Sequence, residues 1–232
     1  RCGIVQRIEG AFQHYAWGDP VFIPELLGLE PDGRPWAEYW LGTHPNGPAR
    51  LDNGDLLSET TGDLPYLLKL LAATEPLSLQ THPDAEQARA GFERGVFDDP
   101  FPKPELLCAL TPFEAFCGIR PVAATLELLR QLGIDELRRA VATDGPSVTL
   151  ARLYRNEIAS APIIEACRSS HLPEAEWVRK LANRYPGQPS VAATLLLNHV
   201  VLAPGEALRL ESGNLHSYLH GAGIELMSPS DN

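Results

Sequence analysis

Three polar side chains are spaced by two in the segment LSLQTHP, residues 77–83. They are Ser78, Gln80 and His82, and in an extended chain this spacing places all three on one face, with leucine and threonine on the other. Pro83 disfavours a helical conformation at His82 and so supports an extended segment. The pattern predicts a strand with one polar face, which suits a binding site but is also typical of an edge strand that faces solvent.

Two further segments carry groups that can bind a metal or an anion. In Lys103-Pro104-Glu105 an extended proline places a cation and a carboxylate on one face. Glu105 is a candidate metal ligand and Lys103 a candidate phosphate contact, although a surface pair at a strand entrance has the same appearance. His216 follows a turn and begins a short strand, a position where barrels often place ligands, although a structural histidine also fits.

His82, Glu105 and His216 together supply two imidazoles and one carboxylate, and Gln80 adds a neutral oxygen. Zinc takes three or four such ligands and keeps an open position where it is catalytic, whereas two histidines and one carboxylate also suit the iron of an oxygenase. Because the residues come from distant parts of the chain, their types predict only a candidate histidine–carboxylate metal site. Other histidines are candidates for its border: His14, His44 and His220.

A β scaffold is expected to position these residues. Residues 1–118 are rich in proline, glycine and short apolar runs, a pattern typical of many short strands. The run LPYLLKLLAA, residues 64–73, is apolar almost throughout and fits a buried strand or a buried helix. From Val191 onward strands are predicted again, with HSYL and IELM separated by glycines.

Residues 121–186 differ from both flanking regions. Val122, Leu126 and Leu129 recur at helical spacing, and residues 177–185 repeat this pattern. A helical block with β sequence on both sides predicts one β domain that carries a helical insertion.

The composition excludes some classes of partner. The chain has 19 basic and 30 acidic side chains, so 19 − 30 = −11, and it has no block of lysines and arginines. Nucleic acid and anionic membranes are therefore not expected as partners, and a small anionic ligand would need a few local cations. No run of about 18 apolar residues is present, and the four cysteines form no CxxC pair, which favours a reducing cytoplasm.

Several segments, taken in order, resemble one family. QHYAWG, AEYWLGTHP, PLSLQTHP, KPEL, LTPF, PGEA, HSYLHG and the final ELMSPSDN are similar to motifs of the type I mannose-6-phosphate isomerases, a zinc-dependent cupin family. This resemblance implies a mainly β fold with helices. We expect a cupin jelly-roll from residues 1–120 and 188–232, with a helical domain at 121–187.

The resemblance also implies a ligand set and a pocket. One zinc ion per chain is expected among Gln80, His82, Glu105 and His216. Substrate contacts are expected from a set of pocket residues: Trp17, Glu38, Ser78 and Lys103. Catalytic roles are expected from a second set: Lys103, Glu225 and Asp231. Pro102 occupies a position where the family usually has histidine.

The implied reaction is the reversible conversion of mannose 6-phosphate and fructose 6-phosphate. Moving a hydrogen between C1 and C2 requires a base for a weakly acidic carbon proton and a Lewis acid for the oxygen. The family motif continues beyond SDN with an arginine-bearing segment and a further cupin-like domain, which lie outside this chain. The rival hypothesis is a non-catalytic metal-binding cupin that binds a sugar or sugar phosphate.

Overall fold

The computed structural model describes residues 5–232, so the first four residues of the predicted 1–120 segment, Cys2 among them, lie outside the described residues. The chain forms two compact units, one up to Ala115 with Val201–Asn232, the other Phe116–Val200. The first unit contains these elements: β1 (Ile8–Glu9), β2 (Ala11–Gln13), α1 (Phe22–Leu26), β3 (Glu38–Leu41), β4 (Arg50–Leu51), α2 (Leu57–Thr61), β5 (Leu67–Ala73), α3 (Ala85–Glu93), β6 (Glu105–Ala109), β9 (Ala207–Leu210) and β10 (His216–Met227).

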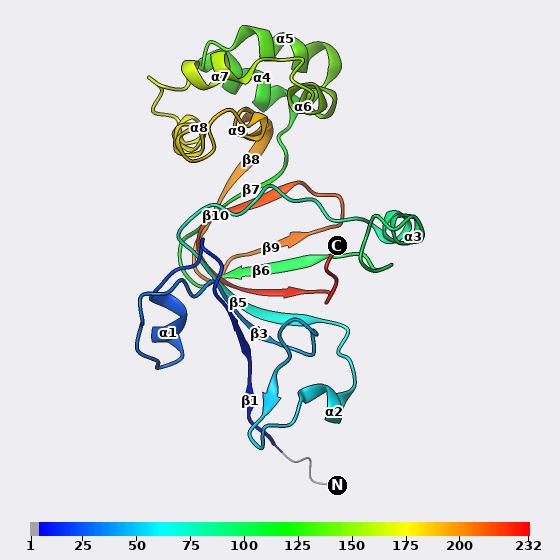
Figure 1. Ribbon diagram of the computed structural model, residues 1–232. Helices are drawn as coiled ribbons and strands as arrows, with labels where there is room; N and C mark the ends of the chain where they lie inside the picture. The colour runs from blue at the N-terminus through cyan, green and yellow to red at the C-terminus, as the bar shows by residue number, and fades with distance from the viewer. Residues whose placement is uncertain (1–4) are drawn as a thin grey trace. The chain divides into compact units, whose positions relative to one another are not determined.

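An antiparallel sheet forms the frame of the first unit. Its strands follow the order β2-β3-β5-β10-β6-β9, and Figure 1 shows β10 between β5 and β6. The apolar run at residues 64–73, for which the sequence left strand and helix open, is therefore largely strand β5. In the register of the sheet Lys69 lies opposite both Glu225 and Trp40, and Glu105 lies opposite Met227. Directly opposite residues share a face, so these side chains lie on one face of the sheet.

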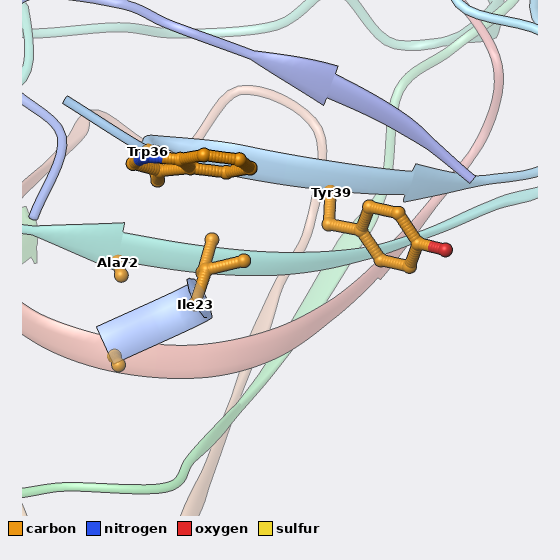
Figure 2. Close-up of a cluster of buried hydrophobic side chains, with 5 residues drawn as sticks. Ile23, Trp36, Tyr39 and Ala72 are labelled. Atoms are coloured by element: carbon orange, nitrogen blue, oxygen red, sulfur yellow. The ribbon is translucent and has the colours of Figure 1, made fainter. Parts of the chain in front are cut away.

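The other face of the sheet packs against helix α1. Figure 2 shows Ile23 of α1 beside Trp36, Tyr39 and Ala72, which are all buried. Tyr39 follows Glu38 in β3, and Ala72 lies three residues after Lys69 in β5. Because successive residues of a strand point to opposite faces, Tyr39 and Ala72 lie on the face opposite these charged side chains. Burial of this aromatic cluster at about 25 cal/mol per Å² of apolar surface stabilises the sheet behind the polar face.

The last strand is longer than the sequence indicates. HSYL and IELM, which the sequence separates at two glycines, form the single strand β10. Gly221 adopts a φ of 114°, and a Cβ placed there would lie 2.5 Å from the carbonyl oxygen of Pro112. Glycine permits both the positive φ and the close approach, so the strand continues from His216 to Glu225 without a break.

Helices dominate the second unit, as the apolar spacing of residues 121–186 predicts. They are α4 (Val122–Gln131), α5 (Asp135–Asp144), α6 (Pro146–Tyr154), α7 (Ser160–Ala166), α8 (Pro173–Arg184), α9 (Pro189–Ala193) and the 3-10 turn η1 (Thr194–Leu196). Strands β7 (Phe113–Ile119) and β8 (Leu197–Leu202) pair with each other at the start and end of this segment. Among residues 5–232, none of the helices combines the length and the hydropathy that a bilayer crossing requires.

The predicted return of strand at Val191 is wrong. Residues 189–196 are helical, and strand begins at Leu197. Pro189 occupies the first turn of α9, where its missing N–H costs nothing. The following alanines and leucines favour helix more than a strand, so local propensity decides this segment.

Candidate active site

Three buried side chains from separate elements converge in the first unit. His82 lies just before α3, Glu105 begins β6 and His216 begins β10, the strand start that the sequence predicts. Nε2 of His82 lies 3.3 Å from Oε1 of Glu105, and Nε2 of His216 lies 3.3 Å from Oε2 of the same carboxylate. One ligand atom from each of the three residues lies within 4.8 Å of the other two. The structure thus brings together three of the four residues that the sequence and the resemblance proposed as metal ligands.

The hydrogen bonds of the two histidines leave the same nitrogen free on each ring. Nδ1 of His82 donates to the carbonyl oxygen of Asn232 at 2.7 Å, and Nδ1 of His216 donates to that of Asn214 at 3.0 Å. A carbonyl accepts only, so both Nδ1 atoms carry a proton, and Nε2, on the side of Glu105, is the nitrogen of each neutral ring that can bind a metal. Nε2 of His82 is buried and has no hydrogen-bond partner among residues 5–232. An orphaned buried nitrogen next to a carboxylate fits a bound metal ion.

The charge state of the carboxylate also suits a cation. Burial raises the pKa of Glu105, but the neighbouring imidazoles of His216 and His82 outweigh this effect, and the pKa lies well below its usual range. Burial lowers the pKa of His216, and Glu105 together with the Asn214 carbonyl reverses the direction, so the net shift is upward. Glu105 is therefore ionised at neutral pH, as a metal-binding carboxylate must be.

Gln80 is held opposite His216 by the backbone. The amide N–H of each residue donates to the carbonyl oxygen of the other, at 2.8 and 2.9 Å, in an antiparallel bridge. The bridge places the two side chains on one face, while Nε2 of Gln80 donates to Oγ of Ser78 at 2.9 Å. The strand predicted for residues 77–83 is not formed, because the segment pairs with β10 through an isolated bridge at Gln80. The role of Gln80 as a fourth ligand stays a prediction.

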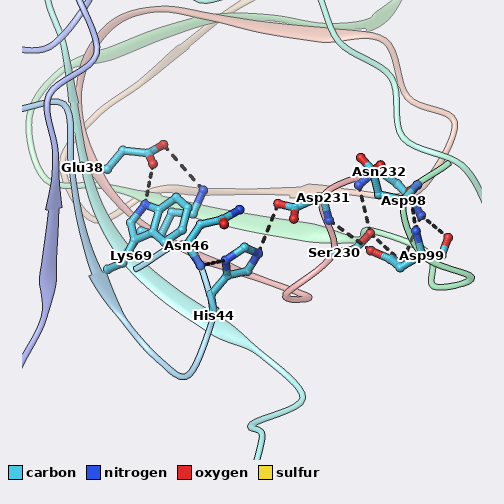
Figure 3. A network of polar contacts seen from close by, with 10 residues as sticks. Glu38, His44, Asn46, Lys69, Asp98, Asp99, Ser230, Asp231 and Asn232 are labelled. Carbon is cyan, nitrogen blue, oxygen red and sulfur yellow. Dashed lines mark hydrogen bonds and ion pairs between the residues drawn. The ribbon is translucent and has the colours of Figure 1, made fainter. Parts of the chain in front are cut away.

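A second buried cluster surrounds Lys69, and Figure 3 shows the contact of Lys69 with Glu38. The ammonium of Lys69 lies 3.6 Å from Glu38 and 3.5 Å from Glu225, and all three residues are less than 9% exposed. Nε1 of Trp40 donates to Glu38 at 2.6 Å, and the hydroxyl of Tyr218 donates to Glu225 at 2.8 Å. We call these five residues the Lys69 cluster.

The Lys69 cluster is held together by opposite charge in a buried environment. Burial favours the neutral amine of Lys69, but Glu225 and Glu38 outweigh burial and the pKa of the amine is raised. Burial raises the pKa of Glu225, and Lys69 opposes that rise. Glu105 acts on both residues electrostatically, so the Lys69 cluster and the histidine–carboxylate group share one electrostatic environment.

Lys103 and Asp231 lie where the two groups meet. Burial lowers the pKa of the Lys103 amine, although Glu105, Glu225 and Asp231 each raise it. Oδ1 of Asp231 lies 3.2 Å from Nε2 of His44, a buried ring whose Nδ1 accepts the backbone N–H of Asn46. His44 therefore carries its proton on Nε2 and donates it to Asp231.

An aromatic pair is coupled to the same environment. The rings of Tyr15 and Trp17 stack at 5.6 Å, and burial and the charge of Glu38 raise the pKa of the Tyr15 hydroxyl. Trp17 itself is half-buried and Ser78 is exposed, so the sequence-predicted pocket residues differ widely in burial.

Two members of the site were missed or undervalued from sequence. Lys69 lies within the apolar run LPYLLKLLAA, and the single lysine in this run is the signal that could identify it, because an unpaired buried lysine is rare. His44 was treated only as a border residue. Its contact with Asp231 joins positions 187 residues apart in the chain, and no local pattern indicates such a pairing.

Comparison with known proteins decides the family. Residues 5–122 match the family model described as phosphomannose isomerase type I, catalytic domain. The chain is 31% identical over 271 residues to the mannose-6-phosphate isomerase of Shigella flexneri, an alignment that covers 98% of this chain and 69% of that protein. It belongs to the type I phosphomannose isomerase family. The human member is 30% identical over 284 residues, covering 96% of this chain and 66% of its own length.

Solved structures of phosphomannose isomerases share the fold. A zinc-bound mannose 6-phosphate isomerase aligns with a TM-score of 0.86 at 30% identity, over 98% of this chain and 69% of its own. The apo form from Salmonella typhimurium also gives a TM-score of 0.86, at 30% identity and with coverage of 98% and 68%. The expected cupin fold with helices is therefore confirmed.

The Lys69 cluster yields a prediction for stability. Replacing Lys69→Met leaves two buried carboxylates without a counter-charge, and we expect the free energy of unfolding to fall by about 3–5 kcal/mol at pH 8. Without Lys69 the pKa of Glu225 in the folded protein rises further. A carboxyl whose pKa is higher in the folded than in the unfolded state makes the protein less stable as pH increases through that pKa. The deficit should therefore shrink at pH 5, as measured by urea unfolding.

A matched control is Lys180→Met in α8, where the lysine is exposed and pairs with Glu176 at 2.9 Å. An exposed pair of this kind is worth about 0.3–0.5 kcal/mol. If the free energy of unfolding falls equally in the two variants and independently of pH, the charge of Lys69 does not stabilise the carboxylates of Glu38 and Glu225.

Proposed function

We propose that this chain carries the catalytic site of a mannose-6-phosphate isomerase, which interconverts mannose 6-phosphate and fructose 6-phosphate. The observation that supports it most directly is the convergence of His82, Glu105 and His216, each buried and each with a ligand atom directed at the others. Two imidazoles and one carboxylate match the ligand types of catalytic zinc. We propose zinc at these three residues, with Gln80 as the fourth ligand.

When bound there, zinc would act as a Lewis acid toward the oxygens at C1 and C2 of the sugar. The protein prepares the site, because Asn232 and Asn214 hold the two rings with Nε2 directed inward. Glu105 keeps its negative charge in a buried position. A preorganised donor set of this kind avoids reorganisation during reaction.

The chain's own residues would move the proton between C1 and C2. Both oxygens of Glu225 are engaged, one by Tyr218 and the other by Lys69, and the residue is 3% exposed. The side chain of Asp231 is about half-exposed, and its carboxylate lies close to one described side chain, that of His44. We therefore favour Asp231 and Lys103 as the groups that exchange a proton with substrate, and we assign Glu225 the role of setting the charge around them.

Lys103 is suited to either of two tasks. Burial lowers the pKa of its amine, which brings a lysine closer to proton exchange near neutral pH. Its charged form, beside the pocket, would also bind a phosphate dianion in a protein of net charge −11. Trp17 and Ser78 are proposed as further substrate contacts, whereas Glu38 would act by holding Lys69 and Trp40.

The setting proposed for this enzyme is a reducing compartment. Cys108, Cys117 and Cys167 are free in the described part of the chain, which supports the cytoplasm that the sequence favours.

A small sugar phosphate is the proposed partner. The catalytic domain is proposed to be the discontinuous segment 1–120 with 188–232.

Removal of zinc tests the proposed function. We expect the purified, zinc-loaded protein to convert mannose 6-phosphate to fructose 6-phosphate, to lose this turnover after chelation, and to regain it when zinc is restored. A protein that binds one zinc per chain yet shows no turnover would instead be the non-catalytic metal-binding cupin. Restoration by iron but not by zinc would point to the oxygenase alternative.

Replacement of Lys103 separates its two proposed tasks. Lys103→Met keeps most of the stem and removes the charge, and a lost charge-assisted contact costs about 1.5–3 kcal/mol. We expect kcat/KM for mannose 6-phosphate to fall by about tenfold or more. A phosphate contact would act mainly on KM and a proton-transfer group mainly on kcat.

Zinc content should not change in this variant, and Lys180→Met should behave as the unmodified protein does. If Lys103→Met keeps full kcat/KM, Lys103 takes no part in substrate binding or proton transfer.

A further inference from the structure

Hydrogen bonds centred on one carboxylate join the loop before β6 to the last described residues. Oδ1 of Asp99 accepts from the N–H of Phe101 at 2.8 Å, the hydroxyl of Ser230 at 3.1 Å and the amide of Asn232 at 3.1 Å. Its Oδ2 accepts the backbone N–H of Asp231 at 3.1 Å. Asp99 thus contacts all of residues 230–232 although it lies about 130 positions away in the chain.

The side chain of Asn232 completes the connection from the other side (Figure 3). Its Oδ1 accepts the backbone N–H groups of Asp98 and Asp99 at 3.0 and 3.3 Å. Its Nδ2 donates to the carbonyl oxygens of Asp99 and Phe101 at 2.8 and 3.1 Å. The loop is rich in residues without an N–H, since it contains Pro100, Pro102 and Pro104. Because proline has no N–H to donate, this loop can form few backbone hydrogen bonds with residues 230–232, and side chains make the connection instead.

We call this set of contacts between Asp99 and residues 230–232 the Asp99 clasp. Two groups of the candidate active site depend on the segment that it holds. The carbonyl oxygen of Asn232 accepts the proton of His82 Nδ1 at 2.7 Å, and the carboxylate of Asp231 accepts from His44 at 3.2 Å. The clasp therefore sets the position of one candidate zinc ligand and of one candidate proton-transfer group.

We propose that Asp99 is a positioning residue that prepares His82 for zinc and holds Asp231 in place. Asp99 contacts the backbone of Asp231 but no side chain of the candidate active site, and it acts through residues 230–232. The carbonyl of Asn232 selects the tautomer of His82 with the proton on Nδ1, which leaves Nε2 able to bind the ion. This inference rests on the proposed zinc site but makes a claim about the metal-free protein as well.

The neighbouring aspartate provides a matched control. Asp98 is exposed, and its carboxylate makes no hydrogen bond or ion pair with the described residues. Asp98→Ala and Asp99→Ala remove the same charge from adjacent positions of one loop. A difference between them therefore reports the hydrogen bonds of Asp99 and not the net charge of the loop.

The test measures the tautomer of His82 and the affinity for zinc in these two variants. In the metal-free protein, long-range ¹H–¹⁵N correlation spectra should show His82 protonated on Nδ1 in the unmodified chain and in Asp98→Ala. In Asp99→Ala we expect loss of that single tautomer. Competition with a chelator should show zinc bound about 10–100-fold more weakly by Asp99→Ala, the usual effect of removing a residue that supports a ligand, and within twofold for Asp98→Ala.

A milder variant keeps the test informative if Asp99→Ala fails to fold. Asp99→Asn retains one acceptor oxygen but turns an N–H₂ group toward the N–H of Asp231, so it should weaken zinc binding to an intermediate degree. Folded variants at position 99 that keep the Nδ1 tautomer and bind zinc within twofold of Asp98→Ala would overturn the proposal. Because neither readout uses turnover, an inactive protein would contradict the proposed isomerase function without contradicting the role of Asp99.

Discussion

The pairing of β10 with its two neighbours is the constraint on which the candidate active site depends. This pairing places Glu225 opposite Lys69 on one side, and Met227 opposite Glu105 on the other. Because side chains alternate between faces, a slip of one residue would move Glu225 to the face that packs against α1 and leave Lys69 with Glu38 alone. The carboxylate of Glu225 would then be buried without a counter-charge, at a cost of several kcal/mol.

The same pairing explains why the site holds so many charged groups. Glu38, Lys69 and Glu225 are buried together, and each carboxylate has a second donor from an aromatic side chain. Glu105 stands apart from this group and lies between two imidazoles that are each fixed by a backbone carbonyl. A cation bound by His82, Glu105 and His216 would balance the negative charge of Glu105, as Lys69 balances the charges of Glu38 and Glu225. The apolar face behind the sheet supplies hydrophobic stabilisation, so the polar face can be devoted to chemistry.

The sequence predicted the features that depend on local pattern. The cupin fold with helices is confirmed, and β10 begins at His216 as its turn and strand signals indicate. The ligand chemistry of His82, Glu105 and His216, with Gln80 beside them, predicted a candidate metal site, and the resemblance implied the same four residues as a zinc ligand set. No local pattern could show that these distant residues meet in the fold. The prediction of strand from Val191 is wrong because a short apolar run does not by itself distinguish strand from helix, and the alanines and leucines of residues 189–196 favour helix. Lys69 was missed because its partners Glu38 and Glu225 come from other strands, and their opposition is a property of register, which residue types alone do not specify.

The central claim is that His82, Glu105 and His216 hold a zinc ion on the polar face of the sheet. Anomalous diffraction from crystals of the zinc-loaded protein, measured above and below the zinc absorption edge, locates the ion and its ligands in one map. We predict one peak per chain between these three side chains, at about 2.0–2.2 Å from each ligand atom. An anomalous peak elsewhere, with His82 and His216 directed away from it, would contradict this account.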